Sequence, residues 1–68
     1  MSASYTYWEE PSGFWIGYWN DYPDYTTQGR SFEELEKMLV SLRADITAMV
    51  EDGTIPATNK TVRELAFA

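Results

Sequence analysis

The sequence predicts a single α+β domain, in which a three-stranded antiparallel meander precedes one long amphipathic helix and a fourth strand. In the first thirty residues, short segments rich in Tyr, Trp, Thr and Ile alternate with turn-forming Pro and Gly, which is typical of consecutive strands. Apolar residues then recur at helical spacing from about residue 32 to residue 52. We expect one domain over 1–68, because a core in a chain of 68 residues rarely divides.

The first two strands are expected to form an antiparallel hairpin over residues 4–9 and 14–20. Both segments contain strand-forming residues, and residues 10–13 between them read Glu-Pro-Ser-Gly, which favours a turn. Along the second strand, bulky side chains point to both faces of the sheet. They are Phe14, Ile16 and Tyr18 on one face, and Trp15, Gly17 and Trp19 on the other. Only one face can pack on the core. The other face is therefore either covered by a further element or partner, or exposed to solvent.

A loop and a short third strand follow the hairpin. Residues 20–24 hold Pro23 among small polar residues, a composition typical of loops. Residues 25–28 read Tyr-Thr-Thr-Gln and are expected to form the third strand, which Gly29 ends. The three strands together make the meander.

The helix has clear local signals at both ends. Ser31 followed by Glu34 is a capping box, in which the two side chains accept hydrogen bonds from backbone N–H groups at the helix start. Glu33 and Lys37 have the spacing of a surface ion pair. Gly53 suits the left-handed conformation that closes a helix.

The helix also has one apolar stripe that should face the sheet. It consists of Phe32, Leu35, Leu39, Leu42, Ile46 and Met49. Val40 and Ala44 lie off this stripe, which indicates a second contact. Further along, residues 61–67 (Thr-Val-Arg-Glu-Leu-Ala-Phe) are expected to form the fourth strand, completing a β-β-β-α-β order.

The charge of the chain is acidic and unevenly distributed. The net charge is −6; residues 1–34 carry six acids and one base, whereas residues 35–68 carry five acids and four bases. Nucleic-acid affinity depends largely on Lys and Arg, and residues 1–29 contain neither, so direct DNA or RNA binding is not expected. An acidic surface instead attracts basic proteins.

The composition also argues against catalysis and against a cofactor. The chain has no His and no Cys, which removes the commonest general base, the thiol nucleophile and the usual transition-metal ligands. Its acids are most simply surface groups, so we expect a non-enzymatic protein without cofactor or metal. Neither a signal peptide nor an apolar run of about 18 residues is present, and we expect a cytoplasmic protein.

Three motifs resemble the N-terminal domain of HicB-type antitoxins. They are residues 13–17 (Gly-Phe-Trp-Ile-Gly), 22–25 (Tyr-Pro-Asp-Tyr) and 27–34 (Thr-Gln-Gly-Arg-Ser-Phe-Glu-Glu). The resemblance covers roughly residues 4–55. It implies a partial RNase H-like fold without the nuclease site, and a role in neutralising a small basic ribonuclease toxin of the HicA type. The DNA-binding segment that HicB antitoxins usually carry after this domain is not expected within this chain.

The predicted mechanism is stoichiometric masking of the toxin's RNA-binding face. Aromatic residues dominate binding hot spots, and acids complement a basic partner, so the candidates lie in and after the second strand. They are Trp15, Trp19, Asp21, Tyr22 and Asp24. The alternative is a stand-alone HicB-like homo-oligomer without a toxin partner, in which the aromatic face is buried against a second copy; a two-fold dimer is then the first expectation.

Overall fold

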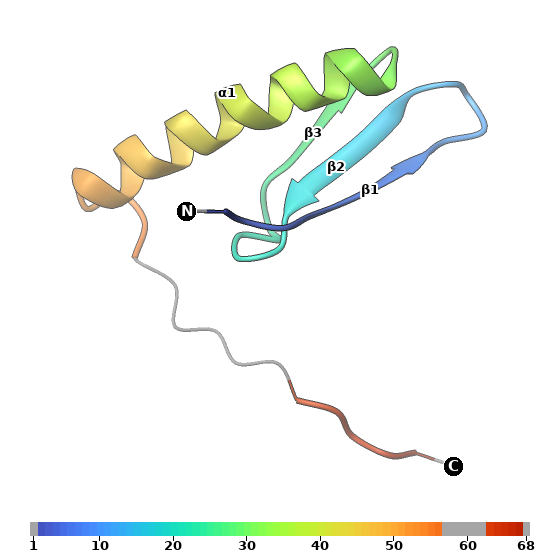
Figure 1. Ribbon diagram of the computed structural model, residues 1–68. Coiled ribbons are helices and arrows are strands. Elements are labelled where there is room, and N and C mark those ends of the chain that lie inside the picture. The colour runs from blue at the N-terminus through green and yellow to red at the C-terminus, as the bar shows by residue number, and fades with distance from the viewer. Residues whose placement is uncertain (1, 57–62, 68) are drawn as a thin grey trace.

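The computed structural model describes residues 2–56 and 63–67. Three antiparallel strands are followed by one long helix, which confirms the predicted α+β class (Figure 1). The elements are β1 (Tyr5–Glu9), β2 (Trp15–Trp19), β3 (Thr26–Gly29) and α1 (Phe32–Glu51). The sheet order is β1-β2-β3, so β2 is central and β1 and β3 are the edges.

The hairpin between β1 and β2 forms as expected from its turn residues. The Glu10 N–H donates to the Phe14 carbonyl at 2.7 Å, and the Gly13 N–H donates to the Glu10 carbonyl at 2.8 Å. Gly13 has φ +94°, a conformation that glycine adopts without strain. The resulting register sets Tyr7 opposite Gly17, and Gly17 opposite Thr27 of β3.

The start of α1 satisfies its free N–H groups with side chains. Ser31 is the N-cap, and its hydroxyl accepts a hydrogen bond from the Glu34 N–H at 3.1 Å. The Glu34 carboxylate reaches back and accepts from the N–H of Arg30 at 3.2 Å, one residue earlier than in the usual capping box.

The end of α1 closes at Gly53, as predicted. Gly53 has φ +82°, and its N–H donates to the Val50 carbonyl at 3.2 Å. The Ile55 N–H then donates to the Met49 carbonyl at 3.3 Å, so carbonyls of the last turn are satisfied by the chain that follows it.

The core lies where α1 crosses one face of the sheet over β2 and β3 (Figure 1). Leu35, Leu39 and Ile46, all on the predicted apolar stripe, are fully buried there. Gly17 lies beneath Leu35: a Cβ at Gly17 would lie 3.5 Å from both Leu35 methyl groups, an ordinary contact distance. Gly29 allows an even closer approach, because a Cβ there would lie 2.6 Å from the Leu35 backbone nitrogen.

Two sequence-based expectations need correction. Residues 63–67 lie in neither helix nor strand and are exposed, while residues 61 and 62 lie outside the described residues. The predicted fourth strand is therefore not seen; Arg63 would share a strand face with Leu65 and Phe67, so no face of that strand is wholly apolar. In the described part of the chain, no ion pair joins Glu33 to Lys37.

Candidate functional site

The two faces of the sheet have different surroundings, and the register decides which side chains belong to each. The aromatic rings of β1 and β2 that contact the helix point toward α1; they are Tyr5, Tyr7, Trp15 and Trp19. The alternate residues of the three strands point away from α1. We call these six the open sheet face: Thr6, Trp8, Ile16, Tyr18, Thr26 and Gln28.

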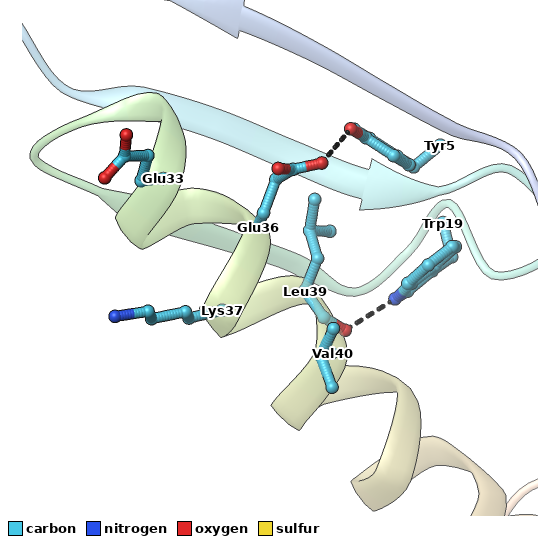
Figure 2. A pocket seen from close by; sticks show the side chains of 7 residues that line it. All are labelled: Tyr5, Trp19, Glu33, Glu36, Lys37, Leu39 and Val40. Carbon is cyan, nitrogen blue, oxygen red and sulfur yellow. Dashed lines mark hydrogen bonds between the residues drawn. The ribbon is translucent and has the colours of Figure 1, made fainter.

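On the helix side, polar groups of the aromatic rings bind α1 (Figure 2). The Trp19 indole Nε1–H donates to the Leu39 carbonyl at 2.8 Å. The Tyr5 hydroxyl donates to the Glu36 carboxylate at 2.7 Å, and this hydrogen bond raises the pKa of the Tyr5 phenol. These two hydrogen bonds join α1 to β1 and β2, in addition to the apolar contacts of the buried core.

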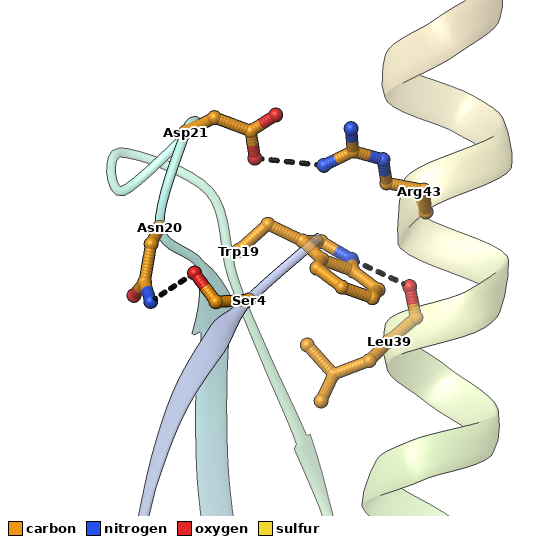
Figure 3. A network of polar contacts seen from close by, with 6 residues as sticks. All are labelled: Ser4, Trp19, Asn20, Asp21, Leu39 and Arg43. Atoms are coloured by element: carbon orange, nitrogen blue, oxygen red, sulfur yellow. Dashed lines mark hydrogen bonds and ion pairs between the residues drawn. The ribbon is translucent and has the colours of Figure 1, made fainter. Parts of the chain in front are cut away.

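Arg43 organises a second set of contacts beside Trp19 (Figure 3). Its guanidinium donates to Asp21 at 2.7 Å and lies 5.1 Å from the Trp19 ring centroid and 5.9 Å from the Tyr22 ring centroid. The hydrogen bond from Arg43 lowers the pKa of the Asp21 carboxyl, partly offset by desolvation. We call Trp19, Asp21, Tyr22 and Arg43 the Arg43 cluster.

The five candidate residues from the sequence therefore do not form one surface. Trp19, Asp21 and Tyr22 meet in the Arg43 cluster, but as part of the contact between α1 and the sheet. Trp15 lies at the other end of β2, with its ring 5.8 Å from that of Phe32. Asp24 is exposed in the loop before β3. The packing of the two Trp residues on α1 favours a role inside the domain over a role as interface anchors.

The open sheet face holds the aromatic residues that sequence reasoning missed. The Trp8 and Tyr18 rings meet edge to face with centroids 6.2 Å apart, and Trp8 is 40% exposed. Ile16 lies opposite Trp8 in the register. Strand alternation sets Trp8 on the same face as Thr6, but the sequence holds no signal for which face α1 covers.

One acidic side chain contacts the open sheet face. The Trp8 indole N–H donates to the Glu10 carboxylate at 3.0 Å in the turn after β1. The three strands carry no Lys or Arg, so this face combines exposed aromatic area with negative charge.

A metal site, a free hydroxyl nucleophile and a membrane-spanning helix would each indicate a function for the described residues. Within residues 2–56 and 63–67 there is no group of three or more Asp, Glu, His or Cys that could hold a metal ion. The Ser31 hydroxyl, a candidate nucleophile by residue type, is engaged as the cap of α1. In the same ranges, no helix is both long enough and apolar enough to cross a membrane.

Comparisons with protein-family models, with curated proteins and with solved structures found no match to this chain. The resemblance to HicB-type antitoxins therefore remains a prediction from the motifs at residues 13–17, 22–25 and 27–34.

Proposed function

We propose that this chain is a non-catalytic protein-binding module, and that it acts as a HicB-like antitoxin that masks the RNA-binding face of a small basic ribonuclease toxin. The observation that carries the proposal is the open sheet face. There Trp8 and Tyr18 pack edge to face, with Trp8 still 40% exposed and bonded to an acidic side chain. A partner that covers them would bury aromatic area, which is typical of interface anchors.

The charge of the domain supports a basic protein as the partner. Residues 1–29, which include all three strands, contain no Lys or Arg. A phosphate backbone would be repelled by this part of the chain, although its aromatic rings could otherwise stack on bases. A basic RNA-binding surface has the opposite sign and would be attracted to it.

The assignment of binding residues changes from the sequence-based prediction. Trp8 and Tyr18 are the proposed anchors, and Asp24 remains a candidate acidic contact. Asp21 and Tyr22 remain candidates through the exposed parts of their side chains, since Asp21 keeps 37% of its side-chain surface exposed beside Arg43.

The first experiment is affinity capture of the tagged chain from its own cells at low salt, with every copurified protein identified by mass. The proposal expects a small basic protein in stoichiometric amount that dissociates at high salt. Its ribonuclease activity should then fall when one equivalent of the purified chain is added back. Recovery of the chain alone, as a multimer that Trp8→Ala dissociates, would support the alternative of a homo-oligomer joined through the open sheet face.

Substitutions test whether the open sheet face is the binding surface. Trp8→Ala should weaken toxin binding by about 2 kcal/mol or more, roughly thirtyfold in Kd. The matched control is Met38→Ala on α1, because Met38 is apolar and similarly exposed, at 43%, on another element. Unchanged affinity of the Trp8 variant, or an equal loss in the control, would remove the open sheet face from the proposal.

A further inference from the structure

A groove runs along one side of α1 next to Trp19. Its first part has a volume of about 610 Å³ between Tyr5, Trp19, Lys37 and Val40, and Figure 2 shows these residues around it. Its second part, of about 510 Å³, continues past Trp19 and Val40 to Ala44, Ala48 and Glu51. The two parts share Trp19 and Val40, so together they form one groove, which we call the α1 groove.

The helix side of the α1 groove has the spacing of a helix–helix seam. Lys37, Val40, Ala44, Ala48 and Glu51 line the groove at steps of three, four, four and three residues, a spacing that is symmetric about Ala44. Val40 is 68% exposed although it is apolar, and Ala44 is exposed as well. Small side chains at the middle of such a seam let a second helix approach closely.

The charges at the ends of the seam specify which helix would fit. An antiparallel copy of α1, related by a two-fold axis at Ala44, sets Lys37 of each copy opposite Glu51 of the other. The same register sets Val40 opposite Ala48. Lys37 and Glu51 lie 14 positions apart on the helix, about 21 Å at 1.5 Å per residue, so they cannot pair within one helix. Neither side chain has an ion-pair partner among the described residues.

We propose that the α1 groove binds α1 of a second copy of this chain, antiparallel about a two-fold axis at Ala44. The pairing buries Val40 and the exposed alanines, and it joins Lys37 to Glu51 twice. A second copy also enlarges a core in which only Leu35, Leu39 and Ile46 are fully buried among the described hydrophobic residues. Small domains often gain stability by such association. Because α1 and the open sheet face lie on opposite sides of the sheet, this dimer does not depend on the proposed function.

Charge reversal tests the register as well as the interface. The oligomeric state of the purified full chain is measured by sedimentation equilibrium at micromolar concentrations, where we expect a dimer. Lys37→Glu and Glu51→Lys alone should each raise the dimer Kd about tenfold or more, because each places two like-charge pairs in the seam. An equimolar mixture of the two variants should restore association as a heterodimer, since opposite charges then meet at both ends. The double variant Lys37→Glu/Glu51→Lys should dimerise like the native chain.

A monomeric native chain would overturn the proposal. So would a dimer that neither charge reversal weakens, or variants that stay monomeric when mixed. Val40→Glu provides an independent check. It should dissociate the dimer because it places a charge in the apolar part of the seam, whichever way Lys37 and Glu51 pair. Circular dichroism of each variant shows whether it folds; these side chains are exposed, so unfolding is not expected.

Discussion

Gly29→Ala tests the central packing contact of the fold. Gly29 is the last residue of β3 and is buried, yet its φ is not in the left-handed region. It is therefore required for space and not for backbone conformation. A Cβ there would lie 2.6 Å from the Leu35 nitrogen and 3.0 Å from the Leu35 Cα and the Glu34 carbonyl carbon.

The expected cost follows from which atoms are in the way. All three are backbone atoms of the first turns of α1, so no side chain can rotate aside. Bringing the 2.6 Å contact to an ordinary 3.4 Å requires α1 to retreat from β3, which lifts Leu35 from its place over Gly17. Overpacking of this kind costs about 1–3 kcal/mol, and we expect the upper end because the backbone must move.

The magnitude is large for this chain. At about 0.05–0.15 kcal/mol per residue, 68 residues have a free energy of unfolding of roughly 3–10 kcal/mol. A loss of about 3 kcal/mol should lower Tm by about 15 °C or leave the variant partly unfolded at room temperature. Urea and thermal unfolding, followed by circular dichroism and Trp fluorescence, measure both quantities.

Two other glycines provide controls. Gly17→Ala should cost less, because its Cβ would meet the Thr6 carbonyl oxygen at 3.2 Å and movable Leu35 methyl groups at 3.5 Å. Gly53→Ala has open space around it, and only its φ of +82° opposes the change, at about 1 kcal/mol. At positions where the backbone conformation suits alanine and space is free, Gly→Ala stabilises a protein by about 0.4–1 kcal/mol, because it lowers the conformational entropy of the unfolded chain. A Gly29→Ala variant as stable as the native chain would refute the described contact between β3 and α1.

Three further substitutions examine the contacts that fasten α1. Trp19→Phe removes the indole donor to the Leu39 carbonyl and should lower the free energy of unfolding by about 1 kcal/mol in urea titrations. Asp21→Asn should cost less than about 1 kcal/mol at pH 7, because its pair with Arg43 is more than one-third exposed. Since Arg43 lowers the folded-state pKa of Asp21, this contribution is present above the unfolded-state pKa and is lost as pH falls through the folded-state pKa. Native and variant stabilities, measured by thermal melts from pH 7 downward, should therefore converge in acid. Ser31→Ala removes the N-cap of α1 and should cost about 1 kcal/mol, whereas Ser31→Asp should retain most of the stability.

The helix and the strands could be predicted because their signals are local. Ser31 caps the helix, Gly53 closes it, and apolar spacing marks the buried side; each acts within a few residues of chain. The strand segments likewise carry their own propensity and turns. The fourth strand was predicted from residue type alone, but a strand also needs an edge to pair with, and residues 63–67 pair with none in the described part of the chain.

The candidate site depended on the face that α1 covers, which no local signal specifies. The second strand has bulky side chains on both faces, so its pattern fits either choice equally. In the folded domain, Gly17 lies beneath Leu35, both indoles of the second strand point toward α1, and Trp8 and Tyr18 lie on the other face. Asp21 and Arg43 likewise meet across 22 positions of sequence. The sequence by itself determined the three strands, the helix, the acidic charge and the absence of His and Cys. Only the tertiary structure decided which aromatic residues pack on α1 and which lie on the open sheet face, because burial depends on contacts between segments distant in the chain.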